Sequence, residues 1–196
     1  KTTTSINLAA ALSLKDKKVL LIDFDPQGHS SLGLGLDDRK FNYSVYHTLS
    51  ENVPLDTACV PVSEHLTLLP ADIRLASLEQ ALSEVSGREF YLKKLLDPVR
   101  SEYDHIVIDC PPQLGILSVN ALLAADKCIV PVEPGKFGLD GLVKLNQTIE
   151  TLCKKVGHAI QKKYLVSLFD IDSSFAETFY ERMQNNYGED VFKTKI

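Results

Sequence analysis

The sequence contains no tryptophan, only one methionine and four cysteines, and it has no long apolar run. The cysteines lack a C-x-x-C spacing and a paired histidine, which argues against a zinc site or a disulfide framework and favours reduced thiols. No apolar run approaches the roughly 20 residues that cross a bilayer, and no positively charged segment followed by an apolar core opens the chain. These absences predict a cytoplasmic protein without a transmembrane segment.

Length and composition are those of an ordinary globular protein. The 196 residues are 44% apolar and 24% charged, which is enough for one sizeable core and predicts a single domain over residues 1–196. The net charge of −5 gives no global attraction to nucleic acid, so DNA binding would need a local basic patch. Because the chain opens on Lys1 and its only methionine is Met183, we expect a fragment of a longer protein.

One stretch, residues 19–35, organises the rest of the chain; it reads V-L-L-I-D-F-D-P-Q-G-H-S-S-L-G-L-G. Its apolar start has no alternation, which predicts a strand covered on both faces, as in a parallel sheet flanked by helices. Asp23 and Asp25 follow directly, and in open α/β sheets ligands bind beyond the carboxyl ends of such strands. The alternative is that both acids only start a turn, in which Gly28 supplies the unusual dihedral angles.

A second apolar segment, residues 106–108, ends in Asp109 and continues as C-P-P-Q-L-G, so we expect two strands to carry acids to the same edge. Further strands are expected at 66–69, 128–132 and 164–169, with another starting at Val191. Helices are expected at 1–15, 71–85, 90–99, 116–124, 139–156 and 175–187, with short helical pieces at 45–49 and 55–60. This alternation predicts an α/β fold with a doubly wound, mostly parallel sheet and helices on both faces.

The opening helix begins K-T-T-T, and a helix N-terminus is where phosphates bind, because its N–H groups are free and its dipole is positive there. Lys-Thr is the second half of the phosphate-loop pattern G-x-x-x-x-G-K-[ST], whose glycine-rich first half is absent from the chain. The alternative is that the threonines only cap the helix.

These residues together offer the parts of a phosphate-transfer site. Lys1 supplies a cation for the β/γ-phosphates, and Thr2 supplies a hydroxyl for Mg²⁺. Asp109 supplies the carboxylate for the metal's water shell, and Asp25 suits the attacking water. Since such catalysis is positioning and electrostatics, replacing one acid by its amide should reduce turnover more than it disturbs the fold.

Four blocks of the sequence resemble a known family. K-T-T-T-S-I-N-L-A-A-A-L, L-L-I-D-F-D-P-Q-G-H-S-S-L-G-L-G, I-V-I-D-C-P-P-Q-L-G and I-V-P-V-E-P look like the deviant-phosphate-loop ATPases of the ParA/Soj type, within the MinD/ParA group of P-loop NTPases. The resemblance covers essentially the whole chain. It implies an ATP-dependent homodimer that binds DNA without sequence preference, associates with the nucleoid, and is stimulated by a ParB/Spo0J-like protein to segregate a chromosome or plasmid.

The resemblance also implies the cofactors ATP and Mg²⁺ and assigns roles to individual residues. Lys1 would contact the β/γ-phosphates, Thr2 would ligate Mg²⁺, and Thr3 would lie beside the α/β-phosphates. Asp25 would be the catalytic switch acid, close to the metal, and Asp109 the acid of the second phosphate motif.

Asp23 would lie close to the metal shell, or it would have a purely structural role.

Two departures from the family stand out. The K-G-G-V-G segment, with the lysine that reaches the partner's nucleotide, would precede Lys1, and the adenine-holding segment would follow Ile196. Asp172 stands where many relatives carry a basic residue, and an acid there would repel phosphate.

A basic cluster is expected at the end of the helix 139–156; it comprises Lys154, Lys155, His158, Lys162 and Lys163. It is either a solvated helix end favoured by the dipole or a DNA-facing patch whose binding would weaken steeply with salt.

Three other functions are open on the sequence. One is a MinD-like septum-site ATPase that acts at the membrane, although such relatives usually lack D-P-Q-G. Another is an iron–sulfur reductase protein, for which Cys110 would need a second cysteine on a matching loop. The last is a non-catalytic adaptor with the same fold, against which the retention of Lys1, Thr2 and Asp25 argues.

Overall fold

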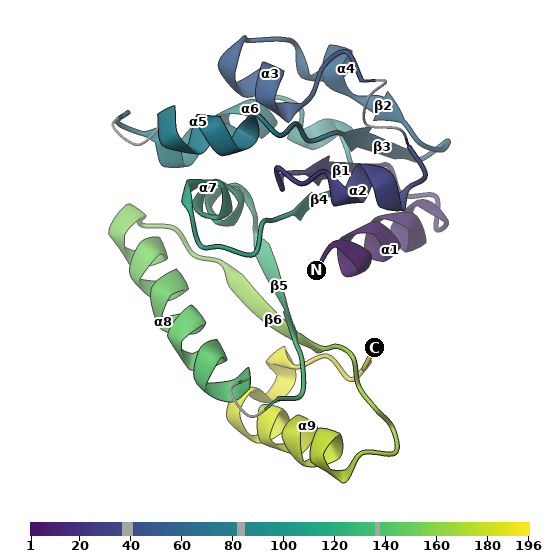
Figure 1. Cartoon of the computed structure of the whole chain (residues 1–196), viewed down its shortest axis with the longest axis vertical. Helices are drawn as coiled ribbons and strands as arrows, with labels where there is room; N and C mark the ends of the chain where they lie inside the picture. Colours follow the sequence, from purple (N-terminus) through teal and green to yellow (C-terminus); the bar gives the residue numbers. More distant parts are fainter. Residues whose placement is uncertain (37–40, 82–84, 136–137) are drawn as a thin grey trace. The chain divides into compact units, whose positions relative to one another are not determined.

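The computed structural model describes residues 1–36, 41–81, 85–135 and 138–196. The chain forms two compact units, Lys1–Ala124 and Ala125–Ile196, each with its own sheet (Figure 1). That residues 1–196 make one domain stays a prediction.

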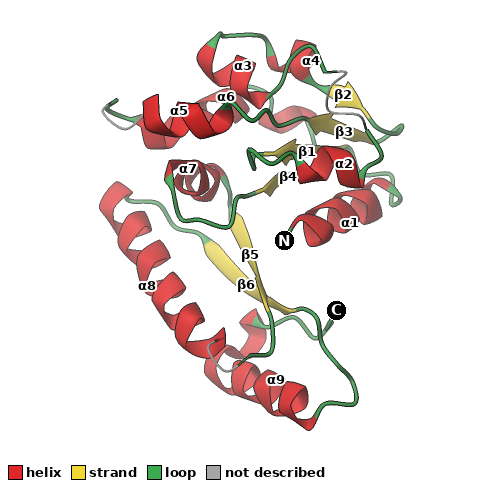
Figure 2. Ribbon diagram, viewed as in Figure 1, coloured by secondary structure: helices red, strands yellow, loops and turns green. Residues whose placement is uncertain are grey.

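The first unit is built on a four-stranded sheet of order β2-β3-β1-β4 (Figure 2). Its strands are β1 (Val19–Asp23), β2 (Val60–Pro61), β3 (Leu66–Leu69) and β4 (His105–Asp109). Strand β1 pairs in parallel with β3 and β4, and the short β2 pairs antiparallel with β3. Its helices are α1 (Thr2–Ser13), α2 (His29–Gly33), α3 (Val45–Ser50), α4 (Leu55–Ala58), α5 (Leu75–Ala81), α6 (Tyr91–Leu96) and α7 (Ile116–Ala124), with the 3-10 turns η3 (Arg88–Phe90) and η4 (Arg100–Glu102).

Strand β1 is completely buried, and its two faces belong to different cores. Leu20 and Ile22 pack with residues of α3, α6 and α7, whereas Val19 and Leu21 pack with Ala9 of α1. Helices therefore cover both faces of the sheet, which is why the strand is apolar without alternation. The predicted α/β fold, with mostly parallel strands, is confirmed.

The second unit contains the parallel strands β5 (Lys127–Val132) and β6 (Gln161–Val166), which pair over six residues. Helices α8 (Gly138–Val156) and α9 (Ser174–Tyr187) and the 3-10 turn η5 (Gly188–Asp190) complete it. Its core contains Val130, Val166, Leu142, Phe179 and Met183.

The segment after η5 runs along β6. Val191 forms a parallel bridge with Tyr164, and the Phe192 amide donates to the Tyr164 carbonyl at 2.9 Å. The Ile196 amide donates to the Val166 carbonyl at 3.0 Å. The strand expected from Val191 is thus present as an isolated bridge with further backbone bonds.

Several predicted boundaries are wrong. The helix expected at 90–99 ends at Leu96, and the helical piece expected at 55–60 ends at Ala58, before β2. The helix expected at 71–85 begins at Leu75, because the Asp72 carboxylate accepts the Arg74 amide at 2.8 Å and shapes a turn first; its expected end falls partly outside the described residues. The strand expected at 164–169 runs from Gln161 to Val166, since Leu168 has a left-handed φ of 53° and ends the extended backbone.

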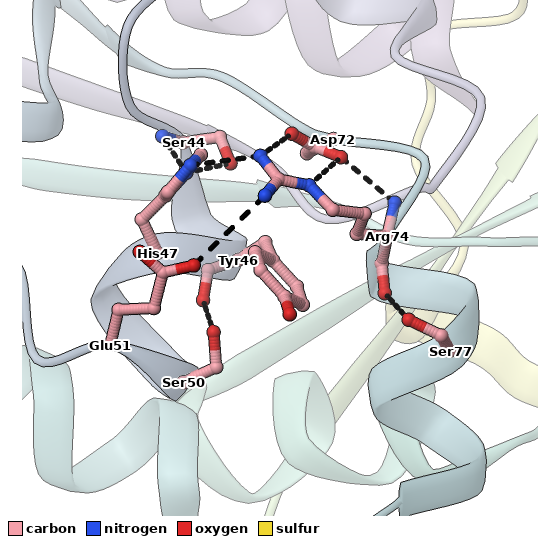
Figure 3. A network of polar contacts seen from close by, with 8 residues as sticks. All are labelled: Ser44, Tyr46, His47, Ser50, Glu51, Asp72, Arg74 and Ser77. Atoms are coloured by element: carbon pink, nitrogen blue, oxygen red, sulfur yellow. Dashed lines mark hydrogen bonds and ion pairs between the residues drawn. The ribbon is translucent and has the colours of Figure 1, made fainter.

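A polar network fixes α3 to the start of α5 (Figure 3). The buried His47 ring accepts a hydrogen bond at Nδ1 from the Ser44 amide, with a distance of 3.0 Å. Its Nε2 lies 2.8 Å from Arg74 Nη2. Arg74 makes a two-pronged contact with Asp72, with Nε–Oδ1 at 3.0 Å and Nη2–Oδ2 at 2.7 Å, and lies 4.6 Å from the Tyr46 ring centre. The network therefore anchors the segment that follows β3.

Candidate functional site

Asp23 and Asp109 end the neighbouring strands β1 and β4 and face each other in register. Both are buried, with 0% and 1% of their surface exposed. The Phe24 amide donates to the Asp109 carbonyl at 2.9 Å, so the strands stay together as β1 ends. The prediction that two strands carry acids to the same edge is confirmed.

The first turn of α1 lies at this acidic edge. Ser5 Oγ donates to Asp109 Oδ1 at 3.1 Å, and the Ser5 amide donates to the Lys1 carbonyl at 2.9 Å. Lys1 directly precedes α1, which begins at Thr2. Within that turn Thr2 is half-buried and Thr3 is exposed. The first turn of α1, where helix amides can bind an anion, therefore lies beside a buried carboxylate.

The Asp23 carboxylate has two different oxygens. Its Oδ2 accepts hydrogen bonds from the amides of Ser30 and Ser31 at 3.0 and 3.2 Å, whereas Oδ1 is buried and has no hydrogen-bond partner among the described residues. Burial raises the pKa of Asp23 from 3.8 to about 7. The hydrogen bond from the Ser31 backbone amide opposes this shift, and the negative charge of Asp109 adds to it.

A magnesium ion fits these residues. A cation, or a water bound to it, would give the buried Asp23 Oδ1 the partner that it lacks. Carboxylates and hydroxyls are also the hard oxygen ligands that Mg²⁺ prefers. Among the described residues no three or more His, Cys, Asp or Glu side chains gather into a metal cage. Mg²⁺ is usually held by one or two carboxylates together with substrate phosphates and water, and Asp23 and Asp109 are two such carboxylates.

Asp25 lies two residues after Asp23 and shapes the loop that follows β1. Its Oδ1 accepts the Gln27 amide at 3.0 Å, and its carbonyl accepts the Gly28 amide at 3.0 Å. Gly28 has a φ of 65°, as a turn of this kind requires. The turn role is therefore present, and the catalytic role of Asp25 stays a prediction.

Two lysines of the basic cluster lie elsewhere than predicted. Lys162 and Lys163 are on β6 rather than at a helix end, because β6 begins at Gln161. Lys162 Nζ pairs with Glu150 at 2.7 Å, and Lys163 Nζ pairs with Asp190 at 3.0 Å.

The rest of the cluster lies at and beyond the end of α8. Lys154 and Lys155 are exposed in its last turn, and the His158 ring contacts the Ala125 carbonyl at 3.2 Å. Asp172 is exposed in the loop before α9, where its amide binds the Asp170 side chain. Lys154 and Lys155 therefore carry the positive charge that this cluster offers to a ligand.

Sequence reasoning missed the serines that surround the acids. Ser30 Oγ donates to Asp109 Oδ2 at 2.9 Å, and Ser31 Oγ lies 3.5 Å from Asp23 Oδ2. With Ser5, they join three segments that are distant in the sequence. In the sequence these serines are visible only as parts of K-T-T-T-S and G-H-S-S. Neither motif indicates which acid each hydroxyl contacts.

Burial affects the pKa of three thiols. Burial raises the pKa of Cys59 to about 12 and also raises those of Cys128 and Cys153, which are free thiols. Cys110, beside Asp109, directs its Sγ to the Ile108 carbonyl at 3.7 Å. Raised pKa values leave Cys59, Cys128 and Cys153 little thiolate character for chemistry.

Comparison with known proteins identifies the family. A family model described as an AAA domain matches residues 1–163. The sporulation initiation inhibitor protein Soj of Bacillus subtilis is 36% identical over 198 residues, which cover all of this chain and 78% of Soj. The chain belongs to the ParA/Soj family. The chromosome partitioning protein ParA of Myxococcus xanthus is 35% identical over the full chain and 70% of its own length.

Solved structures agree with this ParA/Soj membership. A cobyrinic acid a,c-diamide synthase from Mycobacterium smegmatis, with bound ATP analog and magnesium, has a TM-score of 0.86 and 34% identity over 95% of this chain and 77% of its own. A plasmid partition protein from Borrelia burgdorferi has a TM-score of 0.81 and 27% identity over 96% of this chain and 80% of its own. In the described part of the chain, no helix is long and apolar enough to cross a membrane.

Proposed function

We propose that this ParA/Soj protein binds and hydrolyses ATP with Mg²⁺, and that it forms an ATP-dependent homodimer on DNA without sequence preference. A ParB-like partner stimulates hydrolysis, and the cycle segregates a chromosome or plasmid in the cytoplasm, at the nucleoid. One observation carries the proposal: the buried acids Asp23 and Asp109 end neighbouring strands in register, and Ser5 of α1 binds one of them.

Individual roles follow from this arrangement. Lys1 and Thr3 would bind the phosphates at the start of α1, and Thr2 would ligate Mg²⁺. Asp109 would hold the water shell of the metal, and Asp25 would orient the attacking water. Mg²⁺ would neutralise charge on the phosphates, which is the chemistry it supplies to phosphoryl transfer.

Relatives support the nucleotide. The M. smegmatis structure carries an ATP analog and magnesium, and a second structure of that protein carries ADP and magnesium at 34% identity. The buried Asp23 Oδ1, which lacks a donor in this chain, is a place where the metal shell would complete the hydrogen bonding.

The DNA-binding part rests on Lys154 and Lys155, the exposed lysines that end α8. The net charge of −5 gives this chain no overall attraction to DNA, so binding requires such a local patch. The exposed Asp172 opposes DNA contact through the loop before α9.

The decisive experiment measures ATP hydrolysis by the full-length protein, with and without DNA, and compares wild type with Asp25→Ala. We expect the variant to keep nucleotide binding and nucleotide-dependent dimerisation and to lose hydrolysis. Asp56→Ala, which changes an exposed acid of α4, is the matched control and should hydrolyse ATP like wild type. Unchanged turnover in Asp25→Ala would remove Asp25 from the mechanism, and a wild type that binds but never hydrolyses ATP would indicate the adaptor.

A further inference from the structure

Two hydroxyl groups from different elements hold the Asp109 carboxylate. Ser5 Oγ, from α1, donates to Oδ1 at 3.1 Å, and Ser30 Oγ, from α2, donates to Oδ2 at 2.9 Å. The residues are 104 and 79 positions from Asp109 in the sequence, so the fold alone brings them together. Each carboxylate oxygen accepts up to two hydrogen bonds, and one hydroxyl on each leaves both oxygens able to accept a second partner.

Ser30 is held in place independently of its hydroxyl. Its backbone amide donates to Asp23 Oδ2 at 3.0 Å, and the adjacent amide of Ser31 donates to the same oxygen at 3.2 Å. Asp23 and Ser30 are both fully buried. Asp23 therefore fixes the backbone of Ser30, and that backbone aims the hydroxyl at Asp109.

We propose that Ser30 is a positioning residue for Asp109, anchored by Asp23, and that it joins the loop after β1 to the acid of the second phosphate motif. A hydrogen bond to a charged carboxylate is about twice as strong as a neutral one, so it resists rotation of the carboxyl group. Ser5 holds the other oxygen from the nucleotide-binding helix. Ser30 then fixes the position of the loop that carries Asp25 relative to Asp109, the acid that would hold the metal's water.

This role presupposes the Mg²⁺–ATP site proposed above, in which Asp109 serves the metal. Residues that orient metal-binding groups typically change metal affinity by about 10- to 100-fold when they are removed. Removing the Ser30 hydroxyl leaves its backbone amide on Asp23, so the loop keeps its anchor while Asp109 loses one of its two donors. The loss should appear in the Mg²⁺ dependence of nucleotide binding and not in binding without metal.

The test titrates Mg²⁺ into the full-length protein with a fluorescent ATP analogue and compares wild type with Ser30→Ala and Ser30→Thr. We expect Ser30→Ala to need about tenfold more Mg²⁺ for half-maximal binding, with unchanged binding in excess chelator. Ser30→Thr keeps the hydroxyl and should restore most of the Mg²⁺ affinity. Ser50→Ala removes an exposed hydroxyl of α3 that donates to the Tyr46 carbonyl; it is the matched control and should stay within about twofold of wild type. Ser31→Ala reports separately on the neighbouring hydroxyl, which lies 3.5 Å from Asp23 Oδ2.

Thermal unfolding of each variant separates this effect from loss of the fold, and Ser5→Ala tests the second donor to Asp109 without touching the loop. Equal Mg²⁺ dependence in Ser30→Ala and wild type would overturn the positioning role. Equal losses in Ser30→Ala and Ser31→Ala would also overturn it, since they would indicate general damage to the loop. A wild type without any Mg²⁺-dependent nucleotide binding would instead remove the proposed function, and the role of Ser30 with it.

Discussion

Asp23 and Asp109 face each other at the ends of β1 and β4, yet only Asp109 has a hydrogen-bond donor on each carboxylate oxygen. The two acids are alike in sequence context, since each ends an apolar strand, and differ in what the fold places beside them. Asp109 meets hydroxyls from two helices, and Asp23 keeps one buried oxygen without a partner. Asp23 therefore has hydrogen-bonding capacity that the described part of the chain does not fill.

The Asp23→Asn variant should be more stable than wild type in metal-free buffer above pH 7. Folding raises the pKa of Asp23 from 3.8 to about 7, so between these values the native state holds a proton that the unfolded chain has released. Wild type then loses stability from this group as the pH rises from about 4 to 7, by about 2–4 kcal/mol, whereas asparagine has no proton to lose.

Urea unfolding in chelator at pH 4 and pH 8 measures this effect. The stability of Asp23→Asn relative to wild type should increase between the two values. An unchanged difference would show that the native carboxyl titrates at its ordinary pKa. Asp56→Asn, at an exposed site in α4, controls for the charge change.

The Asp72–Arg74 contact should stabilise the first unit near neutral pH and lose its effect in acid. Hydrogen bonding to Arg74 is the main cause that lowers the pKa of Asp72, so the stabilisation is present above 3.8 and is lost as the pH falls through the lowered value. Arg74→Ala should cost about 1 kcal/mol at pH 7 and much less at pH 2–3, measured by urea unfolding. Lys93→Ala breaks the exposed pair with Asp97 and should cost under about 0.5 kcal/mol.

Gly138→Ala should destabilise the second unit. A Cβ there would lie 3.0 Å from the Glu133 carbonyl oxygen and 3.1 Å from the Phe179 ring, so backbone or a buried aromatic must shift. We expect a loss of about 1–3 kcal/mol in urea unfolding. Gly141 lies in the same helix, and a Cβ added there would meet nothing within 4 Å, so Gly141→Ala should gain about 0.5–1 kcal/mol. Similar effects of the two changes would contradict the close approach at Gly138.

Changing Lys154 and Lys155 together to glutamate should weaken duplex DNA binding by the ATP-bound protein. If both lysines contact phosphates, their loss reduces the slope of log affinity against log salt by about 2. Lys93 and Lys94, changed to glutamate on α6, give the same change of charge at another place and should have little effect. Unchanged DNA binding at low salt would leave the end of α8 as solvated surface.

The sheet and its acids were predictable because they follow from local pattern. The unbroken apolar run before Asp23 indicates a strand buried on both faces, and the run before Asp109 repeats it. The sequence pattern predicts the start of the strand Gln161–Val166 too late, because its first half is Q-K-K and looks like a polar turn. Its two lysines instead reach Glu150 and Asp190, which is a tertiary arrangement.

The serine contacts could not be predicted for the same reason. Ser30 and Asp109 are 79 residues apart, and nothing in G-H-S-S distinguishes the serine that meets Asp109 from its neighbour. The unpartnered Asp23 oxygen is equally a property of the folded molecule, since it depends on which amides turn toward the other oxygen.

The segment 191–196 has a consequence for self-association. A strand edge with open N–H and C=O groups is a template on which another molecule can add a strand. On β6 that edge is engaged within the molecule, because Tyr164 and Val166 accept amides from Phe192 and Ile196. Where these two amides are bound, this edge of β6 is therefore closed to strand addition by a second molecule.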